Sequence, residues 1–181
     1  VMRRWLLPGL PARVAASAGR LWRLVLLRTQ LRGRGPGHVL AAARRLRQFV
    51  IKHCTLDDAA MEAVAGQAIP GMTTLQLLDL SHSSGFGAPA WEALGRGLAH
   101  VAPTLRALDV RGCAGLDDAG MAGLFGGGAV FSSLRVLGLY GCRLDAAAGH
   151  AGGASVWTAA VQEGRLPALR SLEVTGGVVS E

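Results

Sequence analysis

The residues best suited to chemistry in this 181-residue chain are its three cysteines, Cys54, Cys113 and Cys142. Thiols can bind zinc, form disulfides or act as nucleophiles, but each role needs further groups at a suitable spacing. The sequence has no C-x-x-C pair, and an odd number of cysteines leaves one thiol outside any set of disulfides. His53 precedes Cys54, yet neighbours in a strand point to opposite faces and cannot act as base and nucleophile. We therefore expect reduced, metal-free thiols and a reducing compartment.

Two glycine-rich segments offer a second kind of chemistry. Residues 85–90 read G-F-G-A-P-A, which fits the dinucleotide-binding pattern G-x-G-x-x-A. Pro89 would stand where the pyrophosphate needs free backbone N–H groups, and proline has none. Residues 126–128 are all glycine but lack the Lys and Ser/Thr of a phosphate loop. We therefore expect no catalytic residue, no cofactor and no small-molecule substrate, and predict that the protein is not an enzyme.

The cysteines fit better as members of a sequence repeat. The pattern L-x-x-L-x-L begins at residues 75, 105, 134 and 169, and an altered copy begins at residue 46. The ninth positions of these copies are Cys54, Ser83, Cys113, Cys142 and Gly177. All three cysteines thus share one repeat position, and a leucine and two aspartates follow Cys54 and Cys113 closely. A shared position indicates a structural role for the thiols rather than a metal site.

These features resemble the leucine-rich repeat family, and its cysteine-containing subclass in particular. The resemblance implies an α/β fold: a solenoid of about five repeats over residues 46–181, with parallel strands on the concave face and helices on the convex face. We expect the apolar first, fourth and sixth positions to form the core, and the ninth position to bond the neighbouring coil's backbone. The expected outer helices cover residues 57–67, 88–101, 117–124 and 155–163. Asp57 or Asp58 and Asp117 or Asp118 would cap two of them.

The charges are divided unevenly along the chain. Residues 1–56 carry twelve basic side chains and no acidic one, whereas residues 57–181 carry seven basic and twelve acidic side chains. An Arg-rich, acid-free segment is typical of organellar transit sequences, so we expect a mitochondrial protein, in the matrix or peripheral to the inner membrane, with the chloroplast as the alternative. The uncharged stretches fall short of the roughly 18 apolar residues that a membrane-spanning helix needs.

We interpret residues 1–45 as a partly helical, transit-peptide-like N-terminal extension that precedes the repeat domain. Residues 12–32 are either an arm that contacts phosphate, anionic lipid or acidic protein, or a solvated helix that caps the domain. Three glycines and a proline at residues 33–37 predict a hinge after it. The arginines expected to contact an anionic partner are Arg13, Arg20, Arg23, Arg28, Arg32 and Arg34.

The concave face offers the candidate protein-binding residues. If the strands alternate regularly, the third, fifth and seventh repeat positions face outward from the sheet. The residues expected to bind there are Leu77, Asp79, Asp109, Arg111, Val136, Tyr140 and Glu173. An apolar strip beside an acidic column, with Tyr140 and Arg111 as anchors, suits a protein and repels nucleic acid. The alternative is that curvature merely tolerates these side chains.

A short repeat domain behind an Arg-rich N terminus is similar to the family of mitochondrial ATP synthase coupling factor B and its relative that assembles the distal membrane arm of complex I. The turn Cys113 to Asp118 and the segment Pro167 to Val174, which reads P-x-L-x-x-L-x-V, carry the resemblance. It implies a non-catalytic accessory or assembly subunit of a mitochondrial inner-membrane complex that docks protein subunits. Two alternatives stay open: a mitochondrial ribosome subunit whose arginines contact rRNA, and a substrate receptor of a ubiquitin ligase.

Overall fold

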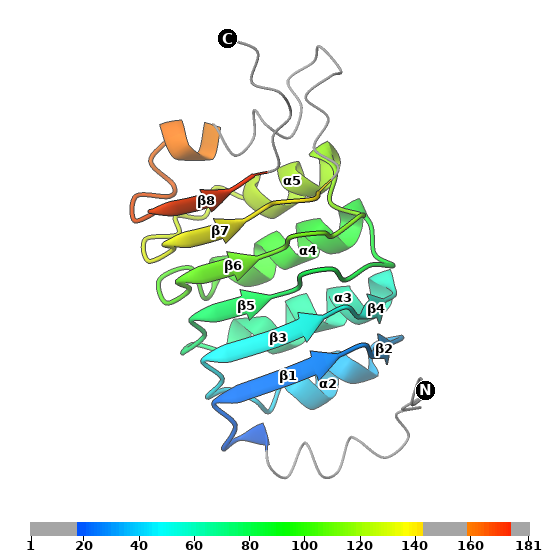
Figure 1. Ribbon diagram of the computed structural model, residues 1–181. Helices are drawn as coiled ribbons and strands as arrows, with labels where there is room; N and C mark the ends of the chain where they lie inside the picture. The colour runs from blue at the N-terminus through cyan, green and yellow to red at the C-terminus, as the bar shows by residue number, and fades with distance from the viewer. Residues whose placement is uncertain (1–17, 143–158, 175–181) are drawn as a thin grey trace.

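A single parallel sheet organises the protein, which we describe from a computed structural model covering residues 18–142 and 159–174. Its six strands lie side by side in the order of the sequence (Figure 1). They are β1 (Arg23–Leu27), β3 (Gln48–Lys52), β5 (Leu77–Asp79), β6 (Ala107–Asp109), β7 (Val136–Gly138) and β8 (Ser171–Glu173). A second, two-stranded parallel sheet joins β2 (Gln30–Leu31) to β4 (Thr55–Leu56).

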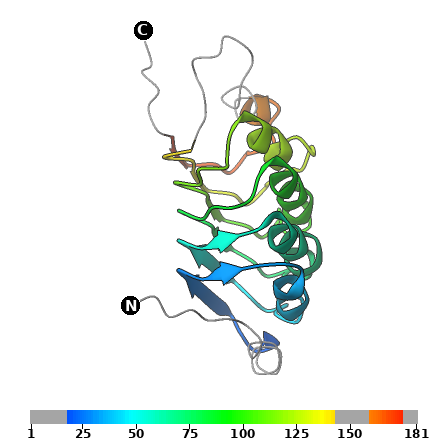
Figure 2. The same ribbon diagram turned by 90° about the vertical axis from the view of Figure 1, so that its right-hand side faces the viewer.

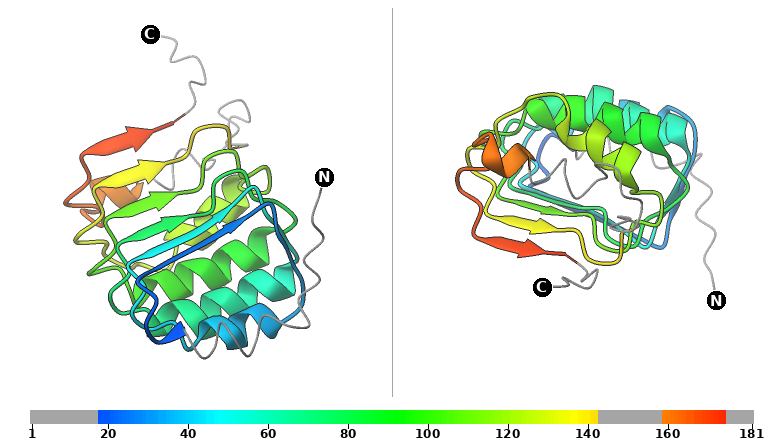
Figure 3. Two further views of the ribbon diagram at one scale, coloured as in Figure 1. Left: turned by 60° about the horizontal axis from the view of Figure 1, so that its bottom comes forward. Right: turned by 90° about the horizontal axis from the view of Figure 1, so that it is seen from above.

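The helices lie on one face of the large sheet and leave the other face open (Figures 2 and 3). They are α2 (Gly35–Leu40), α3 (Asp58–Ala63), α4 (Ala88–Ala99) and α5 (Asp118–Phe125). The π-helix η1 (Val64–Ala68) and the 3-10 turn η2 (Ile69–Gly71) continue α3. A further helical turn covers residues 159–162. The helices expected at 57–67, 88–101 and 117–124 are confirmed to within a few residues. Of the one expected at 155–163, residues 159–162 are helical and residues 155–158 lie outside the described residues.

The core forms between the sheet and the helices from the repeated apolar positions. Leu78, Leu108 and Leu137 are in register on adjacent strands, and none of them has exposed surface. Each strand alone buries too little apolar area to be stable, so stability depends on stacking one unit on the next. The predicted strand register is confirmed for the five strands that it covered, but in the last copy Leu169 and Leu172 are only partly buried and Val174 is 37% exposed.

At Cys54, Ser83, Cys113 and Cys142 the ninth repeat position links its unit to the one before it, as expected, while Gly177 lies outside the described residues. The Cys113 thiol donates a hydrogen bond to the Leu80 carbonyl at 3.1 Å, and the Cys142 thiol donates to the Val110 carbonyl at 3.2 Å. In the preceding units, Ser83 donates to Ile51 and Cys54 donates to Leu26, over 2.8 and 3.4 Å. Each acceptor is the sixth-position carbonyl of the preceding unit, so one small donor per unit satisfies the same backbone group.

Aspartates cap two of the helices, as the sequence predicts. The Asp57 carboxylate accepts a hydrogen bond from the backbone N–H of Ala60 at 2.8 Å, at the start of α3. The Asp117 carboxylate accepts one from Gly120 at 2.9 Å, at the start of α5. Such caps satisfy backbone donors that the first helical turn leaves unpaired.

The prediction of a helix within residues 12–32 is wrong where the structure describes this segment. Residues 23–27 form strand β1, which pairs in parallel with β3 and places Leu24 beside Phe49. Leu21, Leu24 and Leu26 are a further copy of the L-x-x-L-x-L pattern, starting 25 residues before Leu46. As a strand, this segment gains hydrogen bonds and apolar contacts from the open edge of β3. These stabilise it more than an isolated helix of weak amphipathicity would be stabilised. The repeat sheet therefore begins at Arg23, not at residue 46.

The hinge expected at residues 33–37 is also wrong, because this segment leads into helix α2. Pro36 lies in the first turn of α2, where the absence of an N–H costs nothing. Gly37 packs so closely on α3 that a Cβ at this position would lie 2.4 Å from the Ala63 carbonyl oxygen. The proline and this glycine therefore start and dock a helix instead of loosening the chain.

The resulting arrangement, a parallel sheet covered on one face by helices, is compatible with a leucine-rich repeat fold. Within residues 18–142 and 159–174, no helix is long and apolar enough to cross a membrane.

Candidate functional site

The face of the large sheet opposite the helices, which we call the open face, carries the predicted protein-binding residues. Strand register places Leu77, Ala107 and Val136 in one row across β5, β6 and β7. The fifth-position row runs beside it through Asp79, Asp109, Gly138 and Glu173. Because alternate residues of a strand point to opposite faces, these rows lie on the side that no helix covers.

Arg111 organises the charges of the open face. Its Nε donates to one oxygen of Asp109 at 2.9 Å, and its Nη1 donates to Glu173 at 2.8 Å. The hydrogen bond and the charge of Asp109 raise the already high pKa of the guanidinium, so Arg111 stays charged. The guanidinium of Arg111, the predicted anchor for a partner, is held in place by two carboxylates of its own chain and stays partly exposed.

This ion-pair network reduces the acidity expected of the face. Asp79, Asp109 and Glu173 contribute three negative charges and Arg111 one positive charge, which leaves a net charge of −2 for the four side chains. The Asp79 carboxylate accepts a hydrogen bond from the backbone N–H of Ser81 at 2.8 Å and has no ion pair among the described residues. A basic group of a partner would therefore meet Asp79 more readily than Asp109.

Exposed apolar side chains stand on both sides of this charged network. Val136 is 39% exposed and Tyr140 is 58% exposed, at the C-terminal end of the sheet. On β1, at the other end, Val25 and Leu27 are exposed as well. The sequence interpretation missed Val25 and Leu27, although the spacing of Leu21, Leu24 and Leu26 would have placed them on the open face.

The arginines expected to form one arm lie instead on different sides of the first strand unit. Arg20 precedes β1, Arg23 lies on the open face beside Gln48, and Arg28 follows β1. Arg32 and Arg34 are exposed on the way into α2. Arg13 lies outside the described residues. The five described arginines are thus fixed to the sheet and divided among three surfaces, and they do not form a separate arm.

The thiols lack the properties of nucleophiles. Burial raises the pKa of Cys113 to about 12, and burial likewise raises the pKa values of Cys54 and Cys142. All three are free cysteines and remain protonated near neutral pH. Their chemistry is that of hydrogen-bond donors to backbone carbonyls.

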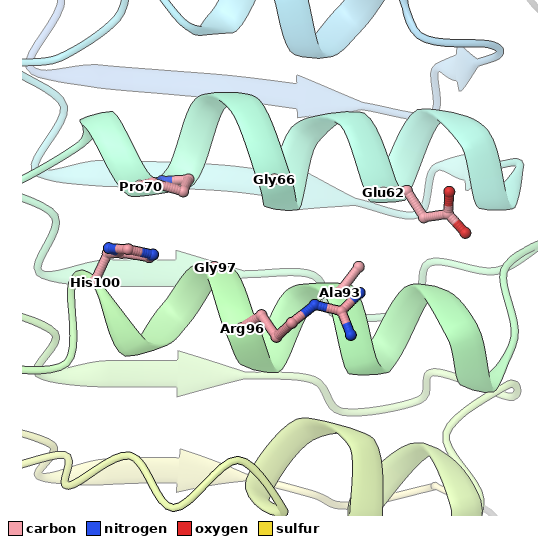
Figure 4. A pocket seen from close by; sticks show the side chains of 7 residues that line it. All are labelled: Glu62, Gly66, Pro70, Ala93, Arg96, Gly97 and His100. Atoms are coloured by element: carbon pink, nitrogen blue, oxygen red, sulfur yellow. The ribbon is translucent and has the colours of Figure 1, made fainter.

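A shallow groove of about 280 Å³ lies on the opposite side of the molecule, between η1 and α4 (Figure 4). Its lining residues are Glu62, Gly66, Pro70, Ala93, Arg96, Gly97 and His100. Arg96 forms an ion pair with Glu92 of its own helix, and both side chains are well exposed. Because its charged groups do not converge on one point, the groove lacks the geometry of a catalytic site.

Comparison with known proteins gives one family match. Residues 101–125, which include β6, Cys113 and all of α5, match a model of the family described as Leucine Rich repeat. No curated protein matches the chain. The similarity to coupling factor B and to the complex I assembly component therefore depends only on the residues named in the sequence analysis. What the match and the parallel sheet support together is a leucine-rich repeat domain, a kind of domain that serves protein–protein interaction.

Proposed function

We propose that this protein is a non-catalytic docking subunit whose open face binds a protein partner within a mitochondrial inner-membrane complex of the respiratory chain or ATP synthase. The stacked units would then be a leucine-rich repeat solenoid, and its concave side would be the open face. The observation that carries this proposal is the exposure of Val136 and Tyr140 beside the Arg111 network. Exposed aromatic and apolar side chains around fixed charges are typical of binding hot spots.

The arrangement also indicates what the partner presents. Tyr140 offers a partner its ring and its hydroxyl group. Val136 offers a small apolar contact and lies about one strand spacing from its register partner Ala107. The Asp79 carboxylate, which has no ion pair among the described residues, favours a basic side chain in the partner. A short protein segment with apolar residues next to a lysine or arginine would complement this surface.

The organelle is supported by residues 1–22, which precede the sheet and contain four arginines and no acidic side chain. The inner membrane is inferred only from the turn Cys113 to Asp118 and the segment Pro167 to Val174, because no curated protein matches the chain. Fractionation of cells expressing the tagged full-length protein tests this part separately, because a cytosolic or secreted distribution would contradict it without touching the docking role.

A matched pair of valine substitutions tests the docking surface. Val136 on the open face and Val161 on the helical turn at 159–162 are 39% and 44% exposed, so Val136→Glu and Val161→Glu disturb folding to a similar small extent. We expect Val136→Glu and Tyr140→Ala to abolish near-stoichiometric copurification of the partner, and Val161→Glu to preserve it. Equal copurification by all three variants would overturn the proposal.

A mitochondrial ribosome subunit is the second candidate, favoured by the exposed arginines Arg20, Arg23, Arg28, Arg32 and Arg34. With Arg13, which lies outside the described residues, six neutralised phosphates would give a salt slope of about −4 to −5 in log K against log salt. RNase would then release the protein from its particle, whereas a docking subunit of a membrane complex would stay bound. The third alternative, a ubiquitin-ligase receptor, gains no support from the structure.

A further inference from the structure

A column of arginines runs along the N-terminal edge of the sheet, where each strand begins. It occupies the second repeat position, one residue after each repeat start. Four of the six residues at this position are arginines; in strand order the six are Trp22, Arg47, Gln76, Arg106, Arg135 and Arg170. All four of these arginines are exposed.

Backbone hydrogen bonds hold this column in line. The N–H of Arg135 donates to the Arg106 carbonyl at 2.8 Å, and the N–H of Arg170 donates to the Arg135 carbonyl at 2.9 Å. Neighbouring strands lie about 4.8 Å apart, so these three residues fall within about 10 Å along the edge. The column is thus a fixed feature of the sheet.

The two edges of the sheet carry different charges. The segments that lead into the strands cover residues 18–22, 43–47, 73–76, 101–106, 129–135 and 163–170. They contain eight arginines and one acidic residue, Glu163, for a net charge of +7. The segments that leave the strands, 28–34, 53–58, 82–87 and 112–118, contain three arginines and four aspartates, for a net charge of −1.

Little within the described part of the chain neutralises the N-terminal edge. Arg165 pairs with Glu163, while the other seven arginines have no ion pair with a described residue. The aspartates sit at the opposite edge because they cap the N-termini of the helices there. The repeat itself therefore separates basic from acidic residues.

Two exposed apolar side chains accompany the arginines. Trp22 begins the column and is 60% exposed, and Val130, in the segment before β7, is 53% exposed. Tryptophan beside basic residues is characteristic of proteins that lie at the membrane interface, where the ring enters the headgroup region and the cations meet anionic lipid.

We propose that this N-terminal edge binds the surface of an anionic lipid membrane. Lipid headgroups need no fixed spacing, so a column about 24 Å long, from Trp22 before β1 to Arg170 before β8, can engage several headgroups at once through its four arginines. A single-stranded nucleic acid would need a series of aromatic side chains for its bases, and Trp22 is the one exposed aromatic residue on the described part of this edge. Binding through the edge leaves the open face accessible, and the inference does not depend on the proposed docking role.

Vesicle binding by the full-length protein tests the proposal. We expect it to cosediment with vesicles of phosphatidylcholine containing 30% cardiolipin or phosphatidylserine, and not with pure phosphatidylcholine. Each arginine near an anionic surface changes the partition coefficient by about fivefold, so the triple variant Arg106→Gln, Arg135→Gln, Arg170→Gln should bind about a hundredfold more weakly.

A matched control removes the same charge from the opposite edge. The triple variant Arg28→Gln, Arg32→Gln, Arg34→Gln should lose far less affinity for the anionic vesicles. Equal losses in the two triple variants would overturn the proposal, because the effect would then reflect net charge alone. Failure to bind anionic vesicles would overturn it too, as would binding of a single-stranded RNA that displaces the vesicles. Melting temperatures within a few degrees of the parent confirm that both triple variants are folded.

Discussion

Arg111, two residues after β6, reaches across β7 to Glu173 on β8, with 2.8 Å between its Nη1 and the carboxylate Oε2. Gly138 makes this reach possible, because it lies in register between Asp109 and Glu173. A Cβ at Gly138 would approach the Arg111 Cγ to 3.1 Å. A missing side chain on one strand thus lets its two neighbours share an ion pair.

Enlarging Gly138 should separate Arg111 from Glu173. In Gly138→Val the branched side chain occupies the path of the guanidinium, so β8 loses a tie to β6. We expect faster amide hydrogen exchange in residues 169–174. The free energy of unfolding should change by less than about 1 kcal/mol from loss of the pair itself, since both partners are partly exposed. Glu173→Gln, which breaks the pair without added bulk, should show the same faster exchange; unchanged exchange in both variants would mean that the pair does not hold β8.

The register of β7 predicts opposite outcomes for neighbouring residues. Leu137 has no exposed surface, whereas Val136 is 39% exposed. Leu137→Asp buries a carboxylate without a partner and should lower the free energy of unfolding by about 3 kcal/mol or more. Val136→Asp should change it by less than about 1 kcal/mol. Urea titrations followed by circular dichroism give both values, and equal destabilisation would contradict the assigned register.

The burial of Cys113 predicts a pH dependence of stability. The pKa of this thiol is about 12 in the folded protein, above the ordinary value of 9.0, so the folded state favours the neutral thiol. The free energy by which this neutral thiol stabilises the folded state is fully present below pH 9. It decreases by about 1 kcal/mol per pH unit as the pH rises from 9 toward 12. Between pH 9 and 10.5 the wild type should lose more stability than Cys113→Ser, which has no titrating thiol there. Identical pH profiles would contradict the burial of the thiol.

Most of the sheet could be predicted from the sequence because the buried positions repeat at a nearly constant interval. Leu46, Leu75, Leu105, Leu134 and Leu169 each start a copy, and the strand that follows each one is present. The strand after Leu21 was missed because the arginines around it resemble a transit segment. Charged residues at outward positions do not oppose a strand, so the apolar spacing was the better guide.

For the open face, the sequence was enough to predict which residues lie there, but not how they contact one another. Alternation along the strands was enough to place Val136, Tyr140 and Asp79 there. The pairing of Arg111 with Glu173 was not predictable, since it links residues 62 positions apart through a gap left by a glycine. The proposed membrane-binding edge is visible in the sequence, because four of the six residues at the second repeat position are arginines.

The contact between the helices predicts different effects for two glycines that face the same groove (Figure 4). A Cβ at Gly97 would lie 2.2 Å from the Ala65 carbonyl oxygen, whereas a Cβ at Gly66 would meet nothing within 4 Å. Gly97→Ala should therefore force α4 away from η1 and lower the free energy of unfolding by about 1–3 kcal/mol. Gly66→Ala should be neutral or raise it by up to about 1 kcal/mol, because alanine favours helix. Denaturant melts would contradict this packing if Gly97→Ala were as stable as Gly66→Ala.

Removing residues 1–45 tests whether the N-terminal segment is part of the fold. This deletion takes away β1, β2 and α2, and it uncovers the edge of β3 together with the side chains of Phe49 and Leu56, which are fully buried in the intact protein. An open edge beside an apolar core favours association, so we expect the shortened protein to melt at least 5 °C lower and to aggregate in size-exclusion chromatography. A deletion of residues 1–17 leaves all of these elements in place and should retain the melting temperature of the full chain. If both shortened proteins remained monomeric and equally stable, the first strand would not belong to the cooperative unit, and residue 46 would be the true start of the domain.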